Sequence, residues 1–107
     1  MVTVRVLAGK GGRPQAGASL IVQVVDTAEQ DAPSRTLGEV RGRVAGGTGS
    51  LLATVTLTPK PGVRPEVWAH VDADDDGRVS HGDFITTQSY PIPDGARPLV
   101  EVTVNRV

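Results

Sequence analysis

The sequence predicts an all-β protein, a seven-stranded antiparallel sandwich of two sheets similar to immunoglobulin or transthyretin folds. Among 107 residues, valine occurs 17 times and threonine 10 times, and β-branched side chains suit pleated strands better than helices. Seven short runs with period-two alternation are separated by segments rich in glycine and proline, which is typical of a sandwich. Helical periodicity is absent over any ten residues, and only residues 27–32 are a candidate for a helical turn.

The expected strands follow from alternation along the chain. The first run places Val2, Val4 and Val6 on one face and polar residues on the other, so we expect one face to be buried and the other to be exposed to solvent. In the second run both faces are largely apolar, which indicates a central strand. The final run places Val100 and its alternate valines inward. In chain order the predicted strands are residues 2–6, 20–25, 37–44, 51–58, 67–72, 84–90 and 99–104.

Glycine, proline and small polar residues mark the connections between these runs, at residues 9–14, 31–34, 46–50, 59–65 and 91–98. We expect residues 1–107 to form one domain, because a chain of this length removes roughly two-thirds of its unfolded surface from water on folding. The chain contains no cysteine, which excludes a disulfide scaffold and thiolate catalysis. We expect no transmembrane segment and no signal segment in the sequence as given.

Charge is segregated along the chain. The formal net charge is −1, from 11 basic and 12 acidic residues, which argues against nucleic-acid binding through a basic surface. Five of the acids fall within residues 72–83, where Arg78 is the only formal cation, so this window carries −4 and the other 95 residues about +3. The acidic window is therefore the first place to look for function.

Residues 72–83 have the spacing of a metal-binding loop. They resemble the calcium loop of an EF-hand, with oxygen-bearing side chains at loop positions 1, 3, 5, 9 and 12 and Gly77 at position 6. Alternate residues of a tightly coiled loop point inward, so their carboxylates converge on one hard cation, and Gly77 makes a turn that a Cβ would obstruct. We therefore predict a Ca²⁺ site whose ligands are Asp72, Asp74, Asp76, the carbonyl of Arg78, Ser80 through a water, and Asp83.

The loop departs from an EF-hand in two ways. Asp83 stands where glutamate is usual and is one methylene shorter, which weakens a bidentate grip on the ion. The flanking segments have the pattern of strands, so the loop is expected to join a β-hairpin between strands five and six. Asp75 is expected to point outward as a non-ligand, and Val79 to be an apolar anchor. The alternative is a bare acidic turn, against which four aspartates within five residues would repel one another without a counter-ion.

Other constellations are weaker. Ser80, His81 and Asp83 are almost contiguous, and neither they nor the paired carboxylates come with an evident cleft, so we expect no enzyme. His70 lies on the face opposite Val67 and its alternate residues, and is expected to be a surface residue. Trp68 and Tyr90 offer the alternative of a carbohydrate-binding module, although packing is the more common role of such rings.

A family resemblance reaches beyond the loop. Residues 18–26, followed by the Asp-Ala-Pro-Ser segment at 31–34 and by Leu37-Gly38-Glu39, resemble the YbaY/YscW-type lipoprotein family, as do residues 67–71 and 84–91. The likeness extends over residues 2–107. It implies a compact β-sandwich on the outer side of a bacterial membrane and, in some members, a pilotin that assists assembly of an outer-membrane secretin. No catalytic residues come with it, and the lipid-accepting cysteine of the family is absent from this sequence.

The sequence thus favours a non-enzymatic, calcium-stabilised β-sandwich module, extracellular or periplasmic, with a structural or protein-interaction role. Its expected partners are a calcium ion and a protein of unknown identity, without nucleic acid. The oligomeric state is left open.

Overall fold

The computed structural model describes residues 1–27, 35–47 and 49–107. These residues form the seven expected strands and no helix. Most of the helical turn expected at 27–32 and the whole 31–34 signature lie outside the described residues. No helix capable of crossing a membrane is found in the described part of the chain. The strands are β1 (Val2–Ala8), β2 (Ser19–Asp26), β3 (Arg35–Arg43), β4 (Leu51–Leu57), β5 (Pro65–Asp72), β6 (Phe84–Thr86) and β7 (Leu99–Arg106).

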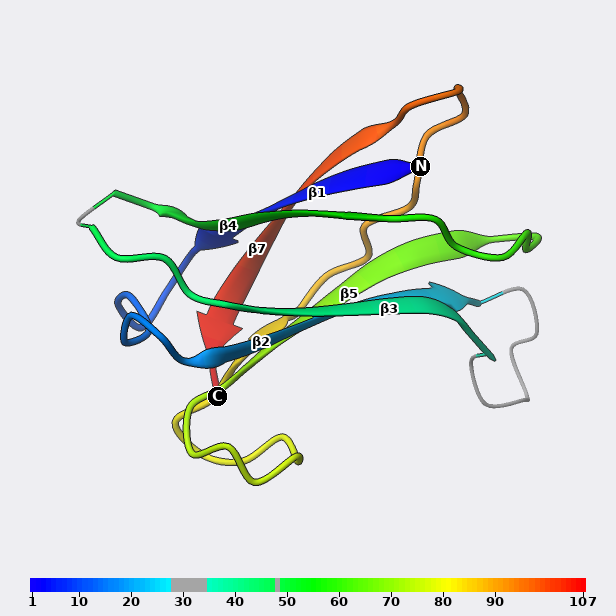
Figure 1. Ribbon diagram of the computed structural model, residues 1–107. Helices are drawn as coiled ribbons and strands as arrows, with labels where there is room; N and C mark the ends of the chain where they lie inside the picture. Colours follow the sequence, from blue (N-terminus) through cyan, green and yellow to red (C-terminus); the bar gives the residue numbers. More distant parts are fainter. Residues whose placement is uncertain (28–34, 48) are drawn as a thin grey trace.

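The strands belong to one mixed sheet rather than to two antiparallel sheets. Their order is β3-β2-β5-β6-β7-β1-β4. Five of the six pairings in the described chain are antiparallel, while β1 and β7 run parallel. The sheet twists until its two edge strands, β3 and β4, lie side by side (Figure 1). The predicted antiparallel sandwich is therefore corrected to a nearly closed barrel, because alternation specifies the faces of a strand but not its neighbours.

The seam between β3 and β4 is closed at its ends. The Ala45 N–H donates to the Leu52 carbonyl at one end (2.8 Å), and the Lys60 N–H donates to the Leu37 carbonyl at the other (2.8 Å). These bonds lie outside any ladder between β3 and β4. The two edges are thus held together without completing the barrel.

The core confirms the predicted alternation. Along most of β1, β2 and β7 every second residue is buried, including Val4, Val22 and Val102, which are fully inaccessible to solvent. The strand β2 has hydrogen-bonded neighbours on both sides, as predicted for a central strand. The remaining core residues are Val2, Val6, Leu20, Val24, Leu37, Val44, Leu52, Leu57, Val67, Ala69, Val71, Phe84, Val100 and Val104.

The strand predicted at 84–90 is shorter than expected and ends at Thr86. The Thr86 hydroxyl accepts the Ala69 N–H (3.3 Å) in place of a backbone carbonyl. The chain then leaves the sheet and returns at Tyr90, whose carbonyl accepts the Val67 N–H (2.9 Å). Thr86 thereby ends the ladder that β6 forms with β5.

Candidate metal centre

The acidic loop joins β5 to β6, as the sequence predicts. These strands pair antiparallel through His70 with Ile85 and Val71 with Phe84, and the loop projects from the end of the sheet next to the C-terminus (Figure 1). Gly77 adopts a φ of 77°, a left-handed conformation that favours glycine. The loop is thus an extension of a β-hairpin rather than a link between helices.

Four predicted ligands converge within this loop. Asp72, Asp74, Asp76 and Asp83 each offer one carboxylate oxygen, and these four oxygens lie within 4.8 Å of one another. The Ser80 hydroxyl lies at the edge of the group and donates to Asp74 Oδ2 (3.1 Å). The spacing of the sequence therefore brings together the side chains that a hard divalent cation would need.

Asp72 organises the turn of the loop from the end of β5. Its Oδ2 accepts the Gly77 N–H (2.8 Å), and its Oδ1 accepts the Asp76 N–H (3.3 Å). The Arg78 N–H donates to Asp76 Oδ1 (2.9 Å), while the role of the Arg78 carbonyl as a ligand stays a prediction. These bonds hold the loop in its coiled form.

Two further residues of the loop lie away from the carboxylate group. The exposed Asp75 accepts the Ser19 hydroxyl at Oδ1 (2.9 Å), which ties the loop to β2 and leaves Asp75 outside the four-aspartate group. Val79 was expected to be an apolar anchor, but its side chain is 46% exposed. That expectation is wrong, because the described chain does not cover this side of the loop.

Asp83 closes the loop from the start of β6. It is fully buried. Its Oδ1 accepts the Ala73 N–H (2.9 Å), and its Oδ2 accepts the Ser80 N–H (3.1 Å) and lies 2.8 Å from His70 Nε2. Burial alone would raise the pKa of Asp83, but the hydrogen bonds from His70, Ala73 and Ser80 outweigh it and lower the pKa below its usual value. Asp83 is therefore ionised at neutral pH and connects the two ends of the loop.

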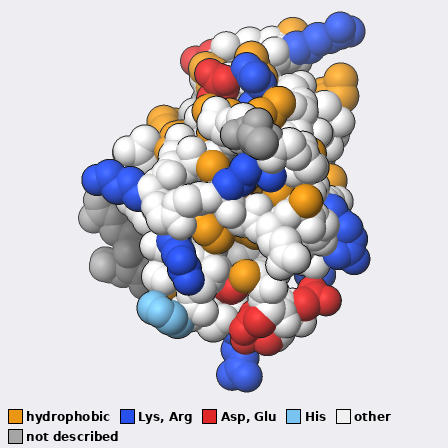
Figure 2. All heavy atoms as spheres, turned by 90° about the vertical axis from the view of Figure 1, so that its left-hand side faces the viewer, with side chains coloured by type: hydrophobic (Ala, Val, Ile, Leu, Met, Phe, Trp, Pro, Cys, Tyr) orange, Lys and Arg blue, Asp and Glu red, His pale blue; other side chains and the backbone are white. Residues whose placement is uncertain are grey.

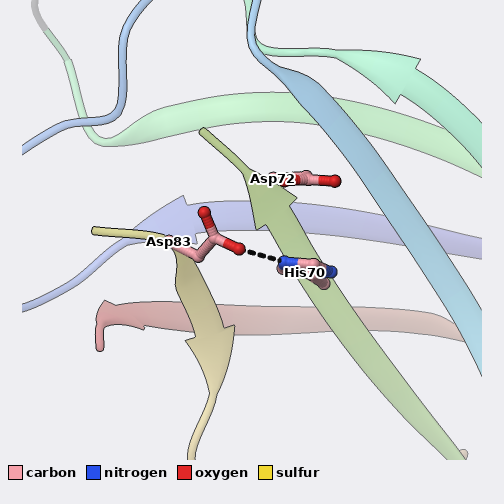
Figure 3. Close-up of side chains that lie close together, drawn as sticks. All are labelled: His70, Asp72 and Asp83. Atoms are coloured by element: carbon pink, nitrogen blue, oxygen red, sulfur yellow. Dashed lines mark hydrogen bonds and ion pairs between the residues drawn. The ribbon is translucent and has the colours of Figure 1, made fainter. Parts of the chain in front are cut away.

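The prediction that His70 lies on the surface is wrong. His70 is 2% exposed, its cross-strand neighbours are Ile21 and Ile85, and its ring lies 5.7 Å from that of Trp68. Asp83, at the end of the acidic loop, lies against His70 on this outer face of the sheet. Figure 3 shows His70 and Asp72 projecting from β5 and Asp83 facing His70 from the neighbouring strand.

A signal for this contact was present in the sequence. Residues 70 and 72 have the same parity, so their side chains share a face of β5. Closing the hairpin then brings Asp83 to that face. The ligand spacing alone gave no reason to include a histidine.

The acidic loop concentrates negative charge at two buried and two exposed carboxylates. Asp72 and Asp83 are 3% and 0% exposed, and buried carboxylates are costly unless they are paired. In the described chain, the only loop acid within ion-pair distance of a basic side chain is Asp83, 2.8 Å from His70 Nε2. This contact involves only one of the two buried carboxylates, and Asp74 and Asp76 lie nearby.

The two aromatic residues considered for carbohydrate binding have separate partners. Trp68 contacts the ring of His70 on the outer face of β5. Tyr90 packs against the core, and its hydroxyl accepts the Thr103 N–H of β7 (3.0 Å). Each ring is thus engaged in the fold.

The chain is similar to one solved structure, described as an alternative pilotin from the type II secretion system of Vibrio cholerae. The TM-score is 0.66 at 21% sequence identity, and the alignment covers 99% of this chain and 95% of that chain. No protein-family model and no curated protein sequence matches the chain. At this identity the likeness shows a shared fold, a pilotin-like β architecture over the full length.

Proposed function

We propose that this protein is a non-enzymatic, calcium-binding β module with a protein-interaction role. The observation that carries the calcium site is the convergence of Asp72, Asp74, Asp76 and Asp83 within 4.8 Å of one another. Carboxylate oxygens are donors that Ca²⁺ prefers, and the Arg78 carbonyl, Ser80 and water would complete its shell of roughly six to eight oxygens. Bound calcium would place a positive charge beside the buried Asp72 and Asp83.

The proposed ion acts as a clamp on the β5–β6 hairpin. It joins Asp72 at the end of β5 to Asp83 at the start of β6 and fixes the intervening turn. Because Asp83 already accepts three hydrogen bonds from the protein, its hold on the ion is expected to be limited. We therefore expect an affinity in the range of extracellular calcium modules, about 10⁻⁴ to 10⁻³ M.

Thermal unfolding tests the calcium site. At about 10 mM calcium the free energy of unfolding should rise by roughly 1.4 to 2.7 kcal/mol, which raises Tm by roughly 5 to 15 °C. Chelator should reverse the shift, and calorimetric titration should show one site. Asp76→Ala should abolish the calcium-dependent shift.

A second variant of the same loop provides the control. Asp75→Asn removes a charge outside the four-carboxylate group and keeps a residue that tolerates the φ of 58° found there. It should retain most of the calcium response. A wild-type Tm that is the same in calcium and in chelator would refute the calcium site.

We further propose that the module acts in the bacterial cell envelope as a pilotin-like, secretion-associated protein, periplasmic or attached to the outer membrane. The support is the full-length likeness to the alternative pilotin, together with the secretin-assembly role that the lipoprotein resemblance implies. Its partner would then be a secretin subunit. Co-expression with a type II secretin tests this: the two proteins should co-purify, and a secretin that elutes alone would contradict the role.

A further inference from the structure

The outer face of the sheet beside the acidic loop carries an ordered set of cross-strand neighbours. On β3, β2 and β5, Arg43 lies opposite Ser19, which lies opposite Asp72. One step along, Arg41 lies opposite Ile21, which lies opposite His70. Next to the β5 end of these rows, the loop is tied to β2 by the bond between Asp75 and Ser19. The β3 end, with two exposed arginines, is left uncovered.

A groove follows the boundary between the loop and β3. It consists of two adjoining hollows of about 470 and 270 Å³ that share Ser19, Arg43, Asp72 and Asp75. The larger hollow extends past Ile21 to Arg41, and the smaller continues back along the chain to Gln15. We call this the loop–β3 groove. In Figure 2, acidic side chains gather toward the lower end of the face shown, with lysine and arginine side chains around them.

The two sides of the loop–β3 groove differ in their capacity for new contacts. On the loop side, Asp72 accepts hydrogen bonds from two N–H groups of its own loop, and Asp75 accepts one from the Ser19 hydroxyl. On the β3 side, Arg41 contacts Glu39 through Nε (3.2 Å) with 72% of its side chain exposed, and Arg43 donates from Nη1 to the Gly17 carbonyl (3.0 Å). A guanidinium has five N–H donors. Both arginines therefore retain donors with which to bind an anion.

We propose that the loop–β3 groove binds an extended acidic segment of a partner protein. Carboxylates of that segment would pair with Arg41 and Arg43, for which the guanidinium fork is well suited. An apolar side chain of the segment would pack on the half-buried Ile21 between Arg41 and His70. The inference rests on the proposed interaction role, and it names the chemistry of the partner. Because Asp72 and Asp75 of the acidic loop also line the groove, calcium bound in the loop would lessen repulsion of the segment and is expected to strengthen its binding.

The shape of the groove favours a peptide over a small anion. The two hollows run along the chain from Gln15 through Ser19 to Ile21, and Arg43 and Arg41 lie beside Ser19 and Ile21 on the neighbouring strand. A single phosphate or lipid headgroup would occupy only the arginine end. An extended chain presents side chains at regular intervals along one direction, which matches this arrangement.

Fluorescence anisotropy with a labelled peptide of alternating glutamate and valine tests the proposal. We expect saturable binding, and the Arg41→Gln/Arg43→Gln variant should bind at least about tenfold more weakly, as the loss of two charge-assisted contacts predicts. Arg97→Gln, an exposed arginine at a distance from the groove, should bind like the wild type. A peptide with lysine in place of glutamate should not bind.

Several results would overturn the proposal: equal affinity of the double variant and the wild type, binding of the lysine peptide, or full competition by inorganic phosphate or anionic vesicles at matched charge. Unchanged thermal unfolding of the double variant excludes loss of folding as the cause. The titration is made in calcium and in chelator, so that failure of the metal site is distinguishable from failure of the groove. Co-purification with a secretin that survives the double variant would separate the secretin role from the groove.

Discussion

At the scale of single residues, Asp83 has a structural role that its place in a ligand pattern does not reveal. Its carboxylate accepts the Ala73 N–H from one end of the loop and the Ser80 N–H from the other. It also lies 2.8 Å from His70 Nε2 on the neighbouring strand β5. A calcium ligand at the twelfth position of such a loop would normally be free to grip the ion. Here the same group also holds the hairpin closed before any ion binds.

Replacing Asp83 should therefore lower stability even without calcium. In chelator, Asp83→Asn should reduce the free energy of unfolding by about 1 to 3 kcal/mol, because an amide cannot accept all the donors that surround this buried position. Denaturant unfolding measures the change. Asp94→Asn, at an exposed aspartate, is the control and should change stability by less than about 0.5 kcal/mol. Equal stability of the Asp83 variant and the wild type would show that these bonds contribute little.

The carboxylate of Asp83 should also account for part of the decrease in the free energy of unfolding at acidic pH. Because the pKa of Asp83 is lower in the folded protein than its ordinary value of 3.8, its contribution is complete above about pH 4 and is lost as pH falls toward and through the folded pKa. The wild type in chelator should thus lose stability more steeply below about pH 4 than Asp83→Asn. Urea unfolding at a series of pH values measures both slopes, and parallel slopes would contradict the assignment.

Among the strands, β6 is short, and side chains beyond its end supply hydrogen bonds that a longer strand would have formed with its backbone. After Thr86 the backbone no longer pairs with β7, and the Tyr90 hydroxyl accepts the Thr103 N–H of β7 instead (3.0 Å). The Tyr90 hydroxyl also accepts a hydrogen bond from Nε2 of the exposed Gln88 (3.0 Å). Tyr90 therefore satisfies a backbone group that an uninterrupted strand would have paired.

Tyr90→Phe isolates this hydroxyl, since the ring and its core contacts are kept. We expect a loss of about 1 to 2 kcal/mol in the free energy of unfolding, because the Thr103 N–H is left without its partner. Gln88→Ala removes only the exposed donor to the same hydroxyl and should cost less than about 0.5 kcal/mol. Hydrogen exchange at the Thr103 amide should quicken only in the tyrosine variant, and unchanged protection there would count against the bond.

At the scale of the whole molecule, barrel closure depends on how closely β3 approaches β4. A Cβ added at Gly38 would lie 3.2 Å from Pro59 Cα and 3.4 Å from Leu57 Cδ1. At Gly42, also on β3, the nearest atom would be Val55 Cγ1 at 3.8 Å. One end of the seam is therefore tightly packed and the other has room.

Two identical substitutions test this difference. Gly38→Ala should lower the free energy of unfolding by about 1 to 3 kcal/mol, because backbone at Pro59 would have to shift. Gly42→Ala should be neutral or stabilising by up to about 1 kcal/mol, because it restricts the unfolded chain without a clash. Chemical denaturation of both variants gives the comparison, and equal effects would contradict a seam that is tighter at Gly38.

Much of the fold and of the candidate site was predictable because it is encoded locally. Alternation specified which residues of β1, β2 and β7 face the core, and ligand spacing identified the four aspartates that the loop brings together. The prediction for 84–90 was too long because no glycine or proline before Pro91 marks the end of the strand, whereas in the structure the Tyr90 side chain takes over the pairing with β7. His70 was misplaced because Asp83 reaches its face of the sheet only when the hairpin closes, and no pattern within β5 records that contact.

Period-two alternation and short-range spacing are properties of neighbouring residues, so they specify the β class, the inward faces of the strands and the acidic loop with its candidate ligands. The parallel pairing of β7 with β1, the single curled sheet and the burial of His70 against Asp83 emerge only in the folded chain. Strand partners distant along the chain are selected by the packing of the whole core. For that reason the loop–β3 groove, built from residues 15–21, 41–43 and 72–77, was visible only in the folded molecule.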